Sequence, residues 1–324
     1  MKTSIPPSQG LQIIEEAITK AKKIMEGQPE TRFTIEEYVK FYQCVYDTCI
    51  QRPSNEYSRQ LYERFKSALE ESITSVVLPS LVNRHDVSLL MELVKMWSNY
   101  KAMALWLSRF FCYLDRYYTQ TKGVTVLNDV VIDCFCDLVC QKFYGKFRDA
   151  AISLIDEERD GNIIDRNLLK DVLNFFLDIG NRRNINFYED FECLMLAHTA
   201  AYYSRKASEC ILEHSYEDYM LKVNCCLNQE RERACHYLCH TREEKLLQIV
   251  SWQMLEQNAD KLLAKRHAEE HALTTNFQEV LSKYGSLNLE EVEHHGHQSQ
   301  SFVSFSRGRV LVCARTETRI HSQF

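Results

Sequence analysis

No proline follows Pro79 in this chain of 324 residues, and that absence limits the fold more than any other feature of the sequence. Proline interrupts a helix because its ring removes the backbone N–H donor and clashes with the preceding turn. Glycine is also scarce, and Gly27, Gly123, Gly161 and Gly180 fall between apolar-periodic segments, where helices usually end. The chain beyond Pro79 can therefore form long helices.

Apolar residues recur with helical spacing through most of the chain. Thr34, with Glu37 three residues later, is typical of a helix start; Asp86 is predicted to cap a later helix, and Pro79 to bend or close one. Strands are hard to find, which indicates an all-α fold. The first five predicted helices are Leu11–Glu26, Thr34–Gln51, Tyr57–Val82, Asp86–Tyr100 and Tyr100–Tyr118.

The order and length of these helices recur further along the chain, which predicts an elongated, α-solenoid-like stalk of stacked repeats. We expect a first repeat over residues 10–123, a second over 124–241 and part of a third over 242–285. Residues 1–9 are predicted to be a disordered N-terminus. Residues 286–324 lack a helical period and are predicted to be a divergent, disordered tail.

Composition narrows the class of protein. A formal net charge of -6 gives no general basic field for nucleic acid or a membrane surface. No run approaches the roughly 18 apolar residues of a membrane span, and the first residues lack the apolar segment of a secretory signal. We therefore expect a protein of the cytoplasm and nucleus, with no nucleic-acid or membrane partner, whose 13 cysteines are free thiols.

The segment Tyr100–Tyr118 carries two stripes at helical spacing. One is apolar and typical of a core-facing side: Met103, Leu107, Phe110 or Phe111, Leu114 and Tyr118. The other mixes large rings with guanidinium groups, which are enriched at protein interfaces: Trp106, Arg109, Tyr113 and Arg116. Spacing alone leaves open the alternative that both stripes are core and that the arginine stems extend to water.

Motifs for catalysis or metal binding are not evident. The sequence lacks the glycine-rich phosphate loops, the nucleophile elbow and the zinc-protease motif, so we expect no enzyme and no cofactor. Cys235, Cys239 and the adjacent His236 and His240 do not have the spacing of a closed zinc site, so no metal is expected. The charged run "NQERERA", residues 228–234, is predicted to be a solvated helix face.

Several stretches in fixed order carry a family resemblance. They include "EEYVKFYQCVYDTCIQRP", "VLPSL", "WLSRFFCYLDRYY", "LIDEERDG", "DFECLMLAHTAAYYSRKAS" and "DYMLKVNCCLNQERERACHYL". Over roughly residues 10–245 the chain resembles the N-terminal region of cullins, and among them the plant cullins that scaffold Skp/F-box (SCF-type) ubiquitin ligases.

The resemblance implies a non-catalytic scaffold in ubiquitin-dependent protein degradation, built of five-helix cullin repeats. Its partners would be a Skp-type adaptor and, through it, F-box proteins. The adaptor would contact the second and fifth helices of the first repeat, here Thr34–Gln51 and Tyr100–Tyr118, with about a third of the assigned residues in the core. The residues so assigned are Tyr38, Phe41, Tyr42, Val45, Tyr46, Trp106, Arg109, Tyr113 and Arg116.

The family's C-terminal domain, which holds the RING subunit and takes the ubiquitin-like modifier, has no counterpart in this sequence. We therefore expect no RING subunit among the partners, and competitive inhibition of full-length cullin. One alternative stays open: the chain is a degenerate cullin paralogue of low stability without a dedicated partner, since a repeat array that lacks a polar cap exposes apolar helices.

Overall fold

The computed structural model describes residues 7–28, 33–51, 54–182, 185–238 and 240–290. Within these ranges the chain is helical, apart from turns and one antiparallel pair of two-residue strands, β1 (Asn181–Arg182) and β2 (Ile185–Asn186). The prediction of an all-α fold is confirmed.

Most of the helices form long runs, and three runs contain a π-helical turn. The elements are α1 (Pro7–Met25), α2 (Ile35–Cys49), α3 (Ser54–Ser72), the π turn η1 (Ile73–Val77), α4 (Leu78–Val82), α5 (Asp86–Phe110), the π turn η2 (Leu114–Thr119), α6 (Gln120–Lys122), α7 (Leu127–Phe135), the π turn η3 (Cys136–Cys140), α8 (Gln141–Arg159), α9 (Arg166–Ile179), α10 (Phe187–Glu213), α11 (Tyr216–Tyr237), α12 (His240–Met254), the 3₁₀ turn η4 (Glu256–Asn258) and α13 (Ala259–Glu290).

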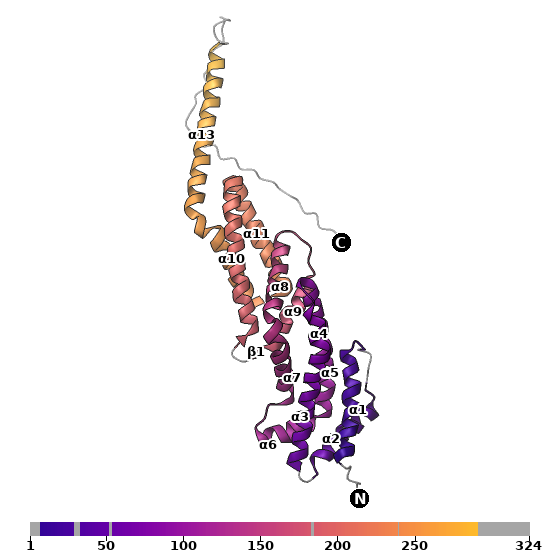
Figure 1. Ribbon diagram of the computed structural model, residues 1–324. Helices are drawn as coiled ribbons and strands as arrows, with labels where there is room; N and C mark the ends of the chain where they lie inside the picture. Colours follow the sequence, from indigo (N-terminus) through magenta and orange to yellow (C-terminus); the bar gives the residue numbers. More distant parts are fainter. Residues whose placement is uncertain (1–6, 29–32, 52–53, 183–184, 239, 291–324) are drawn as a thin grey trace, which may run out of the picture. The chain divides into compact units, whose positions relative to one another are not determined.

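Contacts divide the chain into a first unit, residues 1–265, and a second unit, residues 266–324. Within the first unit, each helix packs on consecutive helices or on helices a few positions away in the chain: α1 against α2 and α5, α2 against α3, α5 against α8 and α9, and α10 and α11 against α12. Figure 1 shows α1 and α2 at one end of this unit and α10 and α11 at the other. Such nearest-neighbour packing is typical of stacked helical repeats.

The hydrophobic core of the first unit has two parts. The larger runs from Ile14 on α1 to Leu246 on α12 and crosses residue 123, the predicted end of the first repeat. The smaller lies among α10, α11 and α12, around Tyr203, Val250 and Met254. Because the larger core is continuous across the predicted junction, the helices on its two sides bury their apolar faces on each other. The predicted repeat boundaries themselves stay predictions.

The predicted fourth and fifth helices are one helix for most of their length. Helix α5 runs without interruption from Asp86 to Phe110, so the predicted break at Tyr100 is wrong. Nothing near Tyr100 opposes a helix, and its buried ring fixes the segment by donating from the hydroxyl to the Val131 carbonyl, 2.8 Å away. The cap also differs: His85 is the N-cap, and Asp86 begins the helix with φ of 48°.

Other boundaries differ at the termini and near Pro79. Helix α1 begins at Pro7 and α13 continues to Glu290, so residues 7–9 and 286–290, predicted to be disordered, are helical. Proline at the first helical position costs nothing, because that N–H has no helical partner. Pro79 neither ends the helix nor leaves it regular: the run widens into η1 just before it and continues to Val82. Residues 1–6 and 291–324 of the predicted flanks lie outside the described residues.

A buried ionic cluster joins α8, α10 and α11. The Arg159 Nε donates to Glu230 Oε1 at 3.0 Å, and Arg233 Nη1 and the Tyr203 hydroxyl donate to the same oxygen at 2.8 Å each. Glu230 is 1% exposed, so the predicted solvated face over residues 228–234 is wrong for Glu230 and Arg233. These two residues lie three apart on the side of α11 that faces α8 and α10.

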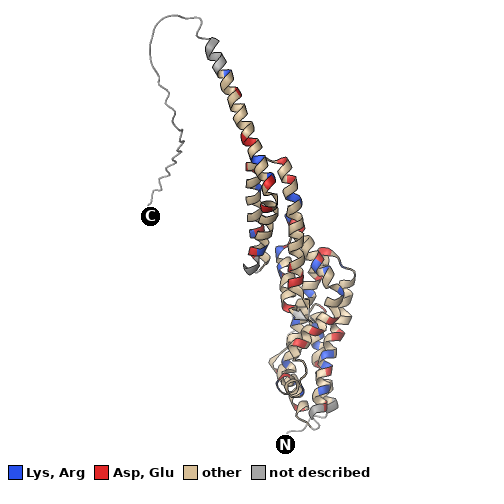
Figure 2. Ribbon diagram, turned by 90° about the vertical axis from the view of Figure 1, so that its left-hand side faces the viewer, with Lys and Arg blue, Asp and Glu red and all other residues tan. Residues whose placement is uncertain are grey.

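Charges of both signs are distributed along the helices of the first unit, as Figure 2 shows, and many of them form ion pairs between helices. Within the described ranges, every helix is too short or too polar to traverse a bilayer.

Candidate protein-interaction surface

The position of α2 is fixed at its first turn. Thr34 Oγ1 accepts from the Glu37 N–H at 3.2 Å, and the Glu37 carboxylate accepts from the Thr34 N–H at 2.8 Å, which is the predicted capping box. Lys20 on α1 donates to the same carboxylate at 2.6 Å. The Lys20 hydrogen bond, with that of Thr34, lowers the pKa of Glu37, so the carboxylate stays charged near neutral pH and ties α2 to α1.

Aromatic rings connect α2 to the end of α5 and to η2. Tyr38 stacks on Tyr42 with ring centroids 6.2 Å apart. Tyr46 meets Tyr113 edge to face at 5.0 Å, and Tyr113 lies 4.5 Å from Tyr117. The aromatic strip consists of Tyr38, Tyr42, Tyr46, Trp106, Tyr113 and Tyr117, of which Tyr117 is exposed and the rest are half-buried.

Two of the predicted contact residues belong to the core. Phe41 is 3% exposed and Val45 0%, so assigning them to the surface is wrong. They lie four residues apart on the side of α2 that packs on α5, where the Phe41 ring contacts Phe110 at 5.3 Å. Tyr38, Tyr42 and Tyr46 flank the buried side of α2, and each is only half-buried.

The other predicted residues come from α5 and the turn after it. Trp106 is half-buried against Phe33, at 5.0 Å, and the exposed Arg109 guanidinium lies 5.2 Å from the Trp106 ring. Arg116 is exposed on η2. The apolar stripe of this segment is the buried one, with Met103, Leu107 and Leu114 each 0% exposed. The second stripe is less buried: Trp106 and Tyr113 are half-buried and pack against the core, while Arg109 and Arg116 are exposed, so the alternative that this stripe also belongs to the core stays open.

Sequence reasoning missed three exposed apolar residues, two beside the aromatic strip and one within it. Ile35 and Val39 on α2 are 80% and 54% exposed, and Tyr117 on η2 is 56% exposed. The signal was present: Ile35, Val39, Tyr42 and Tyr46 follow the i, i+4, i+7, i+11 spacing of one helix face. A second apolar stripe on a helix whose first is buried indicates a binding surface.

The aromatic strip also carries polar groups, namely the Tyr113 hydroxyl and the guanidinium groups at its margin. Burial, with smaller contributions from Cys49 and the neighbouring tyrosines, raises the pKa of Tyr113. Its hydroxyl therefore stays protonated and can donate a hydrogen bond at neutral pH. The exposed Arg109 and Arg116 place positive charge at the margin of the surface.

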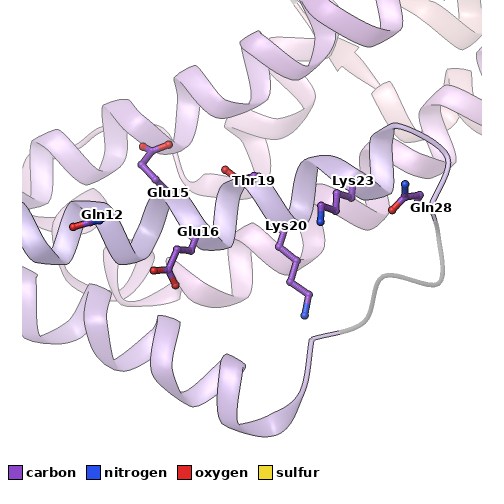
Figure 3. Close-up of a pocket in the computed structure, with 7 residues that line it drawn as sticks. All are labelled: Gln12, Glu15, Glu16, Thr19, Lys20, Lys23 and Gln28. Carbon is purple, nitrogen blue, oxygen red and sulfur yellow. The ribbon is translucent and has the colours of Figure 1, made fainter.

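A shallow groove of about 730 Å³ lies along α1; Figure 3 shows the residues that line it, among them Glu15, Glu16 and Lys20. These charges are engaged in pairs with neighbouring helices: Glu15 with Arg64, Glu16 with Lys40 at 2.6 Å, and Lys20 with Glu37. The groove is explained by packing of α1 between α2 and α3.

The described cysteines are free thiols. Burial raises the pKa of Cys49 to about 11 and that of Cys134 to about 12, which keeps both protonated and unreactive. Within the described ranges, no three His, Cys, Asp or Glu side chains meet as metal ligands would. Since the side chains of Cys239 and His240 lie outside that description, the expectation of no zinc stays a prediction.

Comparison with known proteins agrees with this fold. Residues 12–294 match the cullin family through its alpha solenoid domain. The chain is 49% identical to Cullin-1 of Oryza sativa subsp. japonica over 273 residues, which are 84% of this chain and 37% of that relative. It is 38% identical to Cullin-2 of Arabidopsis thaliana over 265 residues, 82% of this chain and 36% of the relative.

A shorter relative is matched over most of its length. Cullin-like protein 3 of Arabidopsis thaliana is 37% identical over 236 residues, which are 73% of this chain and 91% of that protein. Since the family match covers most of the chain and is centred on its helical repeats, this chain belongs to the cullin family.

Proposed function

We propose that the chain is a non-catalytic scaffold module of SCF-type cullin–RING ubiquitin ligases that binds a Skp-type adaptor and, through it, F-box proteins. The observation that carries the proposal is the solvent-facing apolar side of α2, formed by the exposed Ile35 and Val39 and the half-buried Tyr42 and Tyr46, beside the Tyr113 and Tyr117 rings. A soluble protein retains such a patch where it binds another protein.

The chemistry of the surface supports a partner that offers one helix. Ile35 and Val39 would be covered by apolar side chains of a partner helix, and the tyrosine hydroxyls would fix its register. Arg109 would pair with a carboxylate at the edge of the contact while its guanidinium stays over the Trp106 ring. The proposed partner therefore presents an apolar helix face with acidic residues on one side.

The test is co-elution of the 324-residue polypeptide with a purified Skp-type adaptor bound to an F-box protein, followed by titration calorimetry. A complex with a dissociation constant in the micromolar range or tighter is expected. Separate elution of a chain that is folded by circular dichroism would overturn the proposal. An Ile163→Ala variant, changed at an exposed turn between α8 and α9, should bind like the parent.

We propose further that this polypeptide competes with full-length cullin for the adaptor. The chain matches 37% of the length of rice Cullin-1, and its match to the family, residues 12–294, contains the candidate surface. Added to a reconstituted full-length cullin ligase, it should reduce ubiquitin transfer to an F-box substrate, and excess adaptor should restore the rate. Unchanged transfer at saturating polypeptide would contradict competition.

A second candidate is an unstable cullin paralogue without a dedicated partner. Trp252 on α12 and Leu221 on α11, 57% and 68% exposed, favour it because uncovered apolar surface promotes association. A soluble, cooperative thermal transition would exclude it, whereas aggregation at moderate concentration would support it. Residence in the cytoplasm and nucleus stays a prediction.

A further inference from the structure

An apolar stripe lies along α13 in the second unit. Leu273, Phe277, Val280, Leu281 and Tyr284 are between 49% and 70% exposed. Their spacing of four, three, one and three residues places all five on one side of the helix. Within the described part of the second unit nothing covers them.

We propose that this stripe pairs with the same stripe of a second copy of the chain, with the two helices antiparallel. Leu273 lies four residues before Phe277 and Leu281 four residues after it. A two-fold axis at Phe277 therefore places each Leu273 against Leu281 of the other copy, and the two Phe277 rings against each other. The pattern is self-complementary, as a closed symmetric dimer requires.

The polar residues beside the stripe favour the antiparallel direction. Glu270 lies seven residues before Phe277, and Tyr284 lies seven residues after it. The axis at Phe277 thus brings the Tyr284 hydroxyl, a donor, to the Glu270 carboxylate, an acceptor. A parallel pair would instead oppose Tyr284 with Tyr284 and Glu270 with Glu270, each Glu270 already paired with Arg266 of its own helix at 2.9 Å, so the Tyr284 hydroxyl would not meet a carboxylate.

The area suits a weak, reversible dimer. A fully exposed Phe or Tyr side chain carries about 150–250 Å², so at these exposures the stripe presents on the order of 500 Å² per chain. A pair would bury about 1,000 Å², slightly below the roughly 1,200 Å² at which specific interfaces of standard size begin. The expected dissociation constant is on the order of micromolar.

Sedimentation equilibrium of the full chain from about 1 to about 200 μM brackets that affinity. The expected result is a monomer–dimer equilibrium that Phe277→Glu weakens by about 100-fold or more, since two carboxylates would meet at the axis. Gln278→Glu adds the same charge one position away, off the stripe, and should leave the equilibrium unchanged. Far-UV circular dichroism of both variants checks that α13 stays helical.

A crosslink tests the position of the axis. Phe277→Cys should form a disulfide-linked dimer on mild oxidation, because residue 277 faces its own copy. Gln278→Cys carries the same background of exposed thiols and should not. A dimer that persists in Phe277→Glu would overturn the proposal. A chain that stays monomeric at every concentration would also overturn it; in that case, slow hydrogen exchange over residues 273–284 would show that another part of the chain covers the stripe.

Discussion

We predict that substituting Glu230 lowers the free energy of unfolding strongly, because Glu230 is the acceptor at the centre of the buried ionic cluster. Its two oxygens accept from Arg159, Arg233 and Tyr203, and the side chains of Arg159 and Glu230 are each 1% exposed. Glu230→Gln keeps the volume, so no cavity forms. It removes the buried charge that both guanidinium groups share, leaving Arg159 only Asp156 and Arg233 only Glu158 as carboxylate partners, and places an amide donor among donors.

The magnitude follows from the burial. Removing one partner of a buried ion pair costs about 3–5 kcal/mol, and at 1% exposure little solvent is available to reduce that figure. Domain stabilities are about 5–15 kcal/mol, so the loss is a large fraction of the total. Urea unfolding of the 324-residue chain at pH 7, followed by circular dichroism at 222 nm, should show the midpoint shifted far below that of the parent.

The matched control is Glu232→Gln on the same helix. Glu232 is exposed and pairs with Arg166 at 3.0 Å across solvent, so its loss should change the midpoint little. If Glu230→Gln and Glu232→Gln shift the midpoint by the same small amount, the cluster contributes nothing beyond a surface pair, and the reasoning is refuted.

The pH dependence of the same residue has a defined sign. Burial alone would raise the pKa of Glu230, but Arg159 and Arg233 outweigh it, and the pKa lies below the usual 4.5. The stabilisation is therefore complete above about pH 4.5 and is lost as the pH falls through the lower folded-state pKa. The difference between parent and Glu230→Gln should shrink below pH 4.5; a difference that grows on acidification would contradict this assignment.

Two further predictions concern the start of α2 and metal content. Thr34→Ala removes the side-chain acceptor of the capping box and should lower the free energy of unfolding by about 1 kcal/mol, measured by urea titration, whereas Thr34→Ser should restore most of it. A larger loss in Thr34→Ser than in Thr34→Ala would contradict the capping role. The purified chain should contain no stoichiometric zinc, and chelation should leave its helical circular dichroism unchanged; elemental analysis near one zinc per chain would contradict this.

The sequence predicted the helical class well, because proline scarcity and periodicity act locally. It failed at Tyr100, where the predicted break is a continuous helix, since helix ends depend on what each residue packs against. The Tyr100 hydroxyl donates to the Val131 carbonyl, 31 residues away in the chain, and this contact holds the helix at Tyr100 in place. Such partners are not encoded in the spacing of nearby residues.

The sequence placed the candidate surface on the two helical segments described above, but it did not identify which residues of those segments are exposed. Phe41 and Tyr42 are adjacent aromatic residues on one helix, and only the position of Phe110 determines that Phe41 is buried. Glu230 is the opposite case, a residue predicted to be exposed that is buried. In a run of glutamate and arginine, spacing alone cannot distinguish a glutamate that pairs with the buried Arg159 from one that faces water. The charged composition of the run predicts a solvent-exposed face, but the packing of α11 against α8 and α10 buries Glu230.

The most direct test of the adaptor surface is the affinity of Tyr42→Ala and Tyr113→Ala for a Skp-type adaptor bound to an F-box protein, measured by calorimetry beside each variant's melting temperature. Central tyrosines of an interface commonly contribute about 2 kcal/mol, so each variant should bind about 30-fold more weakly with a nearly unchanged melting temperature.

Two control variants separate a loss of adaptor affinity from a loss of stability. Phe41→Ala, at a core position, should lose several degrees of thermal stability, and Leu212→Ala, exposed on α10, should change neither affinity nor stability. If Tyr42→Ala and Tyr113→Ala instead bind the adaptor as tightly as the parent at unchanged stability, the aromatic strip is not the adaptor surface.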